Sequence, residues 1–214
     1  MSDRWAQRAP WTGIAAVVFA LVVVIVGGES PDSDAGLADI RDFYGDQGAQ
    51  IVASIGVAFV AILFTFFAAT LRSRMRRVEA LSNLMLIGGA LFATGLAIFA
   101  GINFTLVDLV NSDNPISPGA LQSLNALNTD LFFPAVVGLA VFYFSTGLAI
   151  LSTAALPRWW GWITLVLAIF SIAGPLGFAA FVLTLPWTLV SSILLMRDAS
   201  PGSPPGPAQQ QSVS

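Results

Sequence analysis

The sequence predicts an all-α membrane protein: a polytopic bundle of six transmembrane helices with short external amphipathic helices. The first observation is composition, since 56% of the 214 residues are apolar and 10% are charged. Soluble domains have about 45–50% apolar and about 25% charged residues. The second is that uncharged runs long enough to cross a bilayer recur along the chain, with arginines in the short segments between alternate runs. The mean hydropathy of +0.81 indicates loops too short to form a soluble domain.

Composition also excludes several kinds of chemistry. The chain has no cysteine and no histidine, which removes disulfides, thiolate metal sites, cysteine nucleophiles and the commonest general base. The six predicted spans contain no Asp, Glu, Lys, Arg or His, whereas proton pumps and ion-coupled transporters place such groups at depth. We therefore expect no enzyme activity, no cofactor, no metal site and no nucleic-acid partner.

The first element is a span over residues 11–28, preceded by a polar segment, residues 1–10, that carries Arg4 and Arg8. Its uncharged length suffices to cross about 30 Å of hydrocarbon at about 1.5 Å per residue. A cleaved signal peptide is the alternative interpretation. The sequence from Gly27 to Pro31 lacks a clear small-x-small cleavage motif, which favours a retained span.

Residues 29–50 form an acidic segment, with six carboxylates against Arg41 alone. This balance predicts an external loop. Within it Leu37, Ile40 and Tyr44 recur at helical spacing, which predicts a short amphipathic helix lying in the membrane interface and seating the loop on the headgroups.

The second and third spans, residues 50–71 and 80–102, flank the densest basic segment of the chain. Four arginines in so short a loop are hard to carry across a bilayer and predict a cytoplasmic position. Glu79 suits the first turn of the third span, where the helix dipole favours an acid. Ala97 and Gly101 have the spacing that permits close helix packing.

A second external segment, residues 102–130, is expected to contain its own helix. Ser117 followed by Pro118 has the pattern of an N-cap and a first helical residue. Helical periodicity then predicts two faces. The face expected against the bundle comprises Leu121, Leu124 and Leu127 or Leu131. The face expected toward water or a ligand comprises Gln122, Asn125 and Asn128.

The remaining spans are residues 131–156, 159–173 and 178–196. The last two are uncharged throughout and need a turn, which Gly174–Gly177 supplies. Tryptophans around the preceding inner loop, including Trp159, Trp160 and Trp162, are typical of an interfacial belt. The proline-rich residues 198–214 predict a disordered cytoplasmic tail.

The arginines set the orientation. Eight of the nine fall on the predicted inner side and nine of the twelve acids fall on the outer side, so the pattern predicts a multi-pass plasma (inner) membrane protein with both termini cytoplasmic. Arginine without lysine is typical of a bacterial composition. The topology determinants are Arg72, Arg74, Arg76, Arg77, Arg158 and Arg197.

The best candidate for a ligand-binding site lies at the predicted outer mouth. Two carboxylates near several amides could hold a cation or polarise a water. Carboxylates that simply stay hydrated at span boundaries are the preferred alternative. The candidate residues are Asn103, Asp108, Gln122, Asn125, Asn128 and Asp130, with Tyr44 as a further member.

A second polar group lies in the sixth span. Pro186 with neighbouring hydroxyls could break the helix and expose backbone groups to a substrate. The preferred interpretation is a proline kink with hydroxyls bonded to their own helix, and we expect Trp187 in the core or facing lipid. The hydroxyl residues are Thr184, Thr188, Ser191 and Ser192.

Three stretches carry a resemblance. The order Asn128-Thr129-Asp130-Leu131-Phe132-Phe133, Leu156-Pro157-Arg158-Trp159-Trp160-Gly161-Trp162 and Gly174-Pro175-Leu176-Gly177 resembles bacterial multi-pass membrane families of unknown function. The resemblance implies six helices and brings no catalytic residue with it.

Two functions follow as hypotheses. The first is a partner- or lipid-binding membrane component that acts through helix packing and an external cap. Its expected partners are the lipid bilayer and other membrane proteins or further copies of the chain. The alternative is a small permease for an uncharged or weakly cationic solute that enters at the outer amide and carboxylate cluster.

Overall fold

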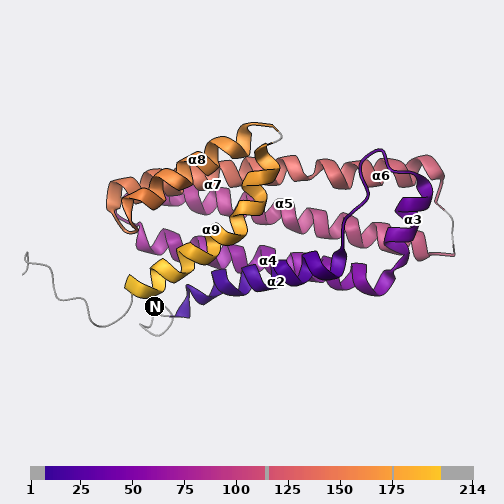
Figure 1. Ribbon diagram of the computed structural model, residues 1–214, viewed down its shortest axis with the longest axis horizontal. Coiled ribbons are helices and arrows are strands. Elements are labelled where there is room, and N and C mark those ends of the chain that lie inside the picture. The colour runs from indigo at the N-terminus through magenta and orange to yellow at the C-terminus, as the bar shows by residue number, and fades with distance from the viewer. Residues whose placement is uncertain (1–7, 114–115, 175, 199–214) are drawn as a thin grey trace, which may run out of the picture.

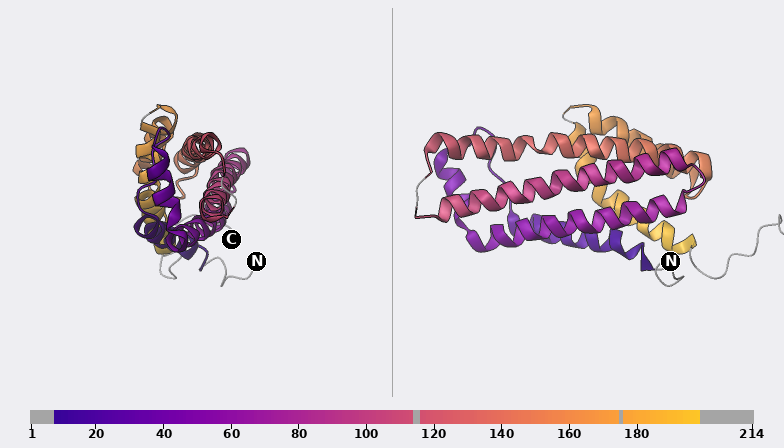
Figure 2. Two further views of the ribbon diagram at one scale, coloured as in Figure 1. Left: turned by 90° about the vertical axis from the view of Figure 1, so that its right-hand side faces the viewer. Right: turned by 180° about the vertical axis from the view of Figure 1, so that it is seen from behind.

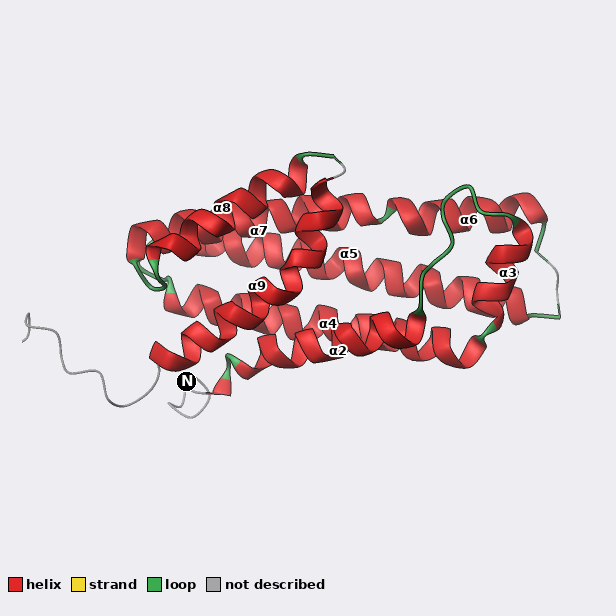
Figure 3. Cartoon of the chain, in the orientation of Figure 1, coloured by secondary structure: helices red, strands yellow, loops and turns green. Residues whose placement is uncertain are grey.

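The computed structural model describes residues 8–113, 116–174 and 176–198, and every regular element within them is a helix. The predicted cytoplasmic segment before residue 8, the predicted disordered tail from residue 199 and Pro175 of the predicted turn lie outside the described residues. In chain order the helices are α2 (Trp11–Gly27), α3 (Leu37–Gly45), α4 (Gln47–Arg74), α5 (Glu79–Asn111), α6 (Pro118–Asp130), α7 (Phe132–Thr153), α8 (Arg158–Ile172) and α9 (Leu176–Asp198) (Figures 1 and 3).

The helices match the predicted spans closely, with one exception: α5 continues through Asn111 where the sequence predicted an end near residue 102. Within the part of the chain that the structure describes, four helical stretches are long and apolar enough to cross a membrane, namely α4, α5, α6 with α7, and α9. The apolar helices α2 and α8 are shorter, with 17 and 15 residues. The chain is thus a helical bundle compatible with a membrane.

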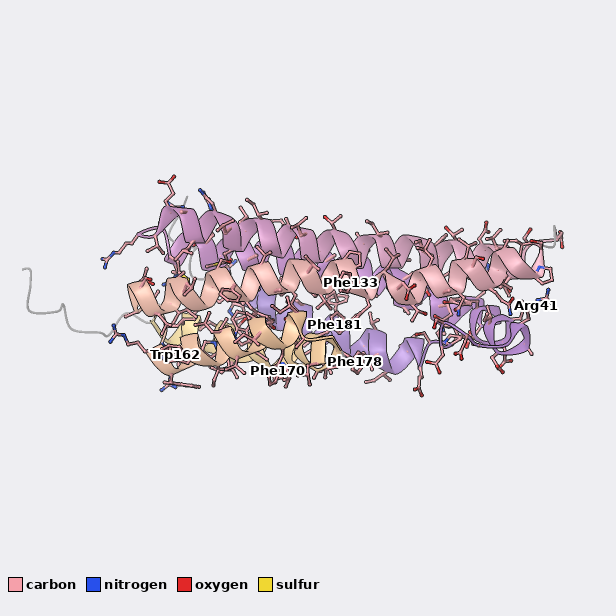
Figure 4. The ribbon with its side chains drawn as sticks, turned by 90° about the horizontal axis from the view of Figure 1, so that it is seen from above. Arg41, Phe133, Trp162, Phe170, Phe178 and Phe181 are labelled. Carbon is pink, nitrogen blue, oxygen red and sulfur yellow. The ribbon has the colours of Figure 1, made fainter. Side chains whose placement is uncertain are left out.

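The long helices lie side by side, and their connections fall at two opposite ends of the bundle (Figures 1 and 2). The start of α2, the end of α9 and the α4–α5 and α7–α8 connections lie at one end, which we call the arginine end. Helices α3 and α6 and the last part of α5 lie at the opposite end. Figure 4 places Arg41 at this opposite end and Trp162 toward the arginine end. Helix α9 starts part-way along the bundle and crosses it obliquely.

Close backbone approach between α5 and α7 depends on glycine. A Cβ added at Gly138 would lie 2.5 Å from the backbone nitrogen of Phe92, and one at Gly95 would lie 2.9 Å from Cα of Ala135. Gly88 meets the backbone of Phe142 in the same way. The predicted small-residue contact therefore exists on the third span, but it uses these glycines, because Ala97 and Gly101 are exposed.

The main core is aromatic and centres on Trp187 of α9, which is only 2% exposed. Its ring lies 5.0 Å from Tyr143, 5.6 Å from Phe142 and 6.2 Å from both Phe67 and Trp160, measured between centroids. The sequence left two positions open for Trp187, in the core or facing lipid, and the structure places it in the core. The rings fill the space between α4, α7, α8 and α9.

A second, smaller core holds the opposite end together, and we call this part of the molecule the cap. Its fully buried members come from α3, α5 and α6: Ile40, Tyr44, Leu106, Val107 and Leu121. The prediction that α3 lies on the headgroups through Leu37, Ile40 and Tyr44 is wrong. Its apolar face packs on α5 and α6, because α5 extends far enough to offer a protein surface in place of the membrane.

Helix α6 begins as predicted, since Oγ of Ser117 accepts a hydrogen bond of 3.4 Å from the amide of Ala120 and Pro118 is the first helical residue. Its predicted faces are partly wrong. Leu121 is buried as expected, but Leu127 is 48% exposed, whereas Asn125 and Asn128 are buried. The helix is rotated so that residues 121, 125 and 128 face inward, because Tyr44 offers the two amides a hydrogen-bonding partner.

Candidate functional site

The six residues predicted at the outer mouth separate into two groups. Asn103, Asn125 and Asn128 are buried, whereas Asp108, Gln122 and Asp130 are exposed. The buried amides form hydrogen bonds within the protein, and the exposed carboxylates lie on the surface of α5 and at the end of α6. The cluster of carboxylates beside amides that the sequence predicted is therefore divided between interior and surface.

Asn103 belongs to a polar layer that joins three helices. Its Nδ2 donates to Oγ of Ser54 on α4 at 2.8 Å. Oγ of Ser54 in turn donates to the carbonyl of Gln50 at 2.7 Å, and Nε2 of Gln50 donates to the carbonyl of Gly27 at 3.0 Å. The layer satisfies the last carbonyl of α2, which would otherwise lack an intrahelical partner. Sequence analysis found Asn103 but missed Gln50 and Ser54, whose partners lie on other helices.

The second network surrounds the hydroxyl of Tyr44. Nδ2 of Asn128 donates to this hydroxyl at 3.3 Å, and the hydroxyl donates to Oδ1 of Asn125 over a longer 3.5 Å. Nδ2 of Asn125 donates to the carbonyl of Asp32 at 2.8 Å, and Asn111 donates to the carbonyl of Tyr44 at 3.0 Å. These bonds tie the acidic segment, α3, α5 and α6 into one unit.

Burial raises the pKa of Tyr44, and the hydrogen bond from Asn128 offsets this rise only in part. The phenol therefore stays protonated at neutral pH and keeps its role as a donor to Asn125. Oδ1 of Asn128 is buried and has no hydrogen-bond partner among the described residues. The hydroxyl of Tyr44 thus both donates and accepts a hydrogen bond, each of them long, and one buried acceptor, Oδ1 of Asn128, is left without a partner among the described residues.

The exposed side of the cap carries an acidic hollow of about 490 Å³. It lies between α3 and the segment that leads into it. The sequence identified this segment as acidic, but it could not show that the carboxylates surround one depression. The lining residues are Glu29, Ser30, Pro31, Asp32, Asp34, Ala35, Asp39, Asp42 and Phe43. Within the described residues, no group of three or more His, Cys, Asp or Glu side chains is placed to hold a metal ion.

No protein-family model, curated protein or solved structure matches the chain. The resemblance of residues 128–177 to bacterial multi-pass families therefore stays a prediction. What the site can do must be inferred from its own geometry.

The polar side chains inside the bundle pair across helices more than the sequence suggested. Nε1 of Trp187 donates to Thr164 at 2.9 Å, and Nε1 of Trp160 donates to Ser191 at 2.8 Å. Trp160 is therefore core, and its assignment to the interfacial belt is wrong. Trp159 and Trp162 are exposed near the arginine end, as that belt requires.

The hydroxyls of α9 were expected to bond within their own helix, and this holds for Thr184. Its Oγ1 donates to the carbonyl of Ala180 at 3.0 Å and accepts from the hydroxyl of Tyr143 at 2.9 Å. Thr188 and Ser192 are buried without a side-chain hydrogen-bond partner in the described part of the chain. Pro186 lies inside α9, which continues through it.

Of the arginines named as topology determinants, Arg72 is held most firmly. Its Nε and Nη2 donate to Oδ1 of Asn83 at 3.0 and 2.8 Å, which fixes the end of α4 on the start of α5. Arg76, Arg77, Arg158 and Arg197 are exposed and Arg74 is half-buried, all at the arginine end.

Proposed function

We propose that the protein is a six-crossing plasma-membrane component with both termini in the cytoplasm, whose cap binds a partner protein on the outer face. The observation that carries the proposal is that Asn125 and Asn128 of α6 face the interior. Both amides form hydrogen bonds with Tyr44 and are not accessible to a solute. The cap is therefore held together internally, and only its surface is available for binding.

Distances along the helices support the position of the membrane. At about 1.5 Å per residue, Ser54 lies about 30 Å from the arginine end of α4 and Asn103 about 36 Å from the arginine end of α5. Asp130 is the last residue of α6 and precedes α7, which is about 33 Å long. A hydrocarbon core is about 30 Å thick. These polar side chains are therefore placed at the outer boundary when the arginines are placed at the inner one.

The two shorter helices fit the same frame. Helix α2 is about 25 Å long and α8 about 22 Å long, and each starts at the arginine end. Helix α2 ends where Nε2 of Gln50 donates to its last carbonyl, that of Gly27, and α8 ends at a turn in which Gly174 has a φ of 60°. Ile172 and Phe178 at this turn are exposed apolar residues and suit the outer edge of the hydrocarbon. Figure 4 labels Phe178. Each is about 5–8 Å shorter than a hydrocarbon core of about 30 Å, so each needs the residues that flank it to complete a crossing.

The cap stands outside this frame. Helix α5 has 33 residues, or about 50 Å, and its part beyond Asn103 extends about 12 Å past the boundary. Its outer part carries the second core, so the cap is stabilised by its own packing and needs no lipid contact. The acidic hollow on its surface suits a basic segment of a partner, since complementary charge steers association and fixes orientation.

The alternative function, a permease, requires a passage through the bundle. The ring cluster around Trp187 fills the middle of the helical packing in this structure. The interior therefore supports helix packing more directly than it supports transport.

Two measurements test the proposal. A photo-crosslinking residue placed at Asp39 should capture an outer partner in intact cells. Raising the salt concentration should lower this capture several-fold. With the crosslinker moved to Ser33, the variant Asp32→Asn/Asp39→Asn/Asp42→Asn, which removes three charges from the hollow, should lower it to a similar extent. The control Asp108→Asn/Asp113→Asn, also with the crosslinker at Ser33, removes charge outside the hollow and should leave capture unchanged.

Proteoliposomes provide the second measurement. We expect no saturable solute flux. Saturable flux that Asp108→Asn and Asp130→Asn abolish would favour the permease. A lack of capture, or capture that does not depend on the charge of the hollow, would reject the hollow as the partner-binding surface.

A further inference from the structure

Helices α5 and α7 form an apolar groove on the outside of the bundle, near the arginine end. The groove has a volume of about 300 Å³. Leu84, Phe144 and Leu148 form its exposed walls, being 46%, 45% and 39% exposed. The small buried residues Ala140 and Ser145 leave the space between them. Figure 2, right, shows that α8 and α9 do not cover this face.

The groove offers almost no polar group to an occupant. Oγ of Ser145, its one hydroxyl, donates to the carbonyl of Val141 at 2.7 Å within α7. The remaining lining side chains are hydrocarbon or aromatic. An occupant is therefore bound through apolar contact alone along the length of the groove.

The connection between α4 and α5, which precedes the part of α5 that lines the groove, is basic. Leu81, the lining residue nearest the arginine end of α5, follows Arg77 by four positions, and Arg76 and Arg77 are both exposed. Arg72 is held on α5 by Asn83, next to the lining residue Leu84. Arginine guanidinium groups bind phosphate oxygens bidentately and are the favoured side chain for this task. The surface thus combines an apolar groove with a basic segment near one end of it.

We propose that this groove holds an acyl chain of an anionic phospholipid whose phosphate binds Arg76 and Arg77. A groove of this volume admits a flexible acyl chain, and the arginines next to it favour an anionic headgroup over an apolar partner helix. The anionic leaflet of a plasma membrane attracts basic residues next to the ends of crossing helices. The site lies at the opposite end from the cap, so it stands or falls independently of partner binding.

Native mass spectrometry of the purified full chain tests the proposal. The probes are dioleoyl phosphatidylglycerol and dioleoyl phosphatidylcholine, which carry the same chains and differ in headgroup charge. We expect the wild type to retain phosphatidylglycerol at least about tenfold better than phosphatidylcholine. Arg76→Gln/Arg77→Gln should lose most of this preference, whereas Arg197→Gln, at the same end but on α9, should keep it. Glu79→Gln removes the acid beside these arginines and should raise retention.

A second variant addresses the groove itself. Leu148→Trp fills it from its exposed rim and should reduce retention of both lipids, while Ile169→Trp on the exposed face of α8 should not. A phosphatidylglycerol with a photoreactive acyl chain supplies a readout on the unaltered protein, where it should label peptides that contain residues 81–84 and 140–148.

The outcomes separate clearly. Equal retention of the two lipids by the wild type would overturn the proposal, as would labelling spread evenly over the exposed faces of α2, α4 and α8. A dimer that Leu148→Trp dissociates, with no lipid retained, would assign the groove to a second copy of the chain and would equally overturn it.

Discussion

The side-chain amide of Asn103 on α5 donates a hydrogen bond of 2.8 Å to the hydroxyl of Ser54 on α4, 49 positions earlier in the chain. Both residues are buried. The bond joins α4 to α5 at the level where the proposed membrane ends and the cap begins.

A double-mutant cycle on this pair should show coupling. Asn103→Ala and Ser54→Ala each leave a buried polar group without its partner, which costs about 1–3 kcal/mol. The double variant should be more stable than the sum of the two by about 0.5–1.5 kcal/mol, as for other hydrogen bonds between membrane helices. Reversible unfolding in mixed micelles measures the terms. Thr105→Ala in place of Asn103→Ala should show no coupling, because Thr105 bonds to its own helix.

Tyr44 should make the stability of the cap depend on alkaline pH. Burial raises the pKa of its folded-state phenol above the usual value of about 10. The folded cap therefore holds this proton more tightly than the unfolded chain. Its stabilising contribution is complete below about pH 10 and is lost as pH rises from there toward the folded-state pKa.

The matched variant for this prediction is Tyr44→Phe, which also leaves Asn125 and Asn128 without the hydroxyl and should cost about 1–3 kcal/mol at neutral pH. Thermal unfolding of the two proteins between pH 8 and pH 11 gives the comparison. The difference in stability should shrink above about pH 10. A difference that stays constant with pH would contradict a buried, protonated Tyr44.

Glycines at the α5–α7 contact should tolerate no side chain. Gly138→Ala places a methyl group against the backbone of Phe92, and Gly95→Ala places one against Ala135. We expect each to destabilise the bundle by about 1–3 kcal/mol or more, since the obstacle is backbone or a closely packed methyl. Gly101→Ala on the same helix has nothing within 4 Å and should be neutral or stabilising by up to about 1 kcal/mol. Equal effects at the three positions would refute the contact.

Single cysteines should report the orientation cleanly, because the chain has none of its own. In intact cells a membrane-impermeant thiol reagent should label Ser33→Cys and Ser117→Cys from outside. It should reach Ser73→Cys and Ser203→Cys only after the membrane is opened. Labelling of Ser203→Cys without opening would mean an odd number of crossings and would reverse the proposed position of the C-terminus.

Much of the architecture could be read from the residues because its signals are local. Uncharged runs placed the long helices to within a few residues, and Ser117 with Pro118 marked the start of α6. Arginines between alternate runs predicted that Arg72 through Arg77, Arg158 and Arg197 share one end of the molecule, as they do. Each of these signals depends on neighbours in the sequence.

Only the tertiary structure decided how the helices turn about their axes and what they meet. Asn125 and Asn128 face inward, where they form hydrogen bonds with Tyr44, and this partner lies 81 and 84 positions away in the sequence. Periodicity alone assigned them to the surface, since an amide side chain is polar wherever it sits. Helix α3 packs on protein because α5 continues to Asn111, past the predicted end of its span. The indole N–H of Trp160 is satisfied inside the bundle, since it donates a hydrogen bond to Oγ of Ser191. The sequence by itself determined where helices lie and which end is basic, whereas contacts between distant residues determined the cap, the aromatic core and the groove.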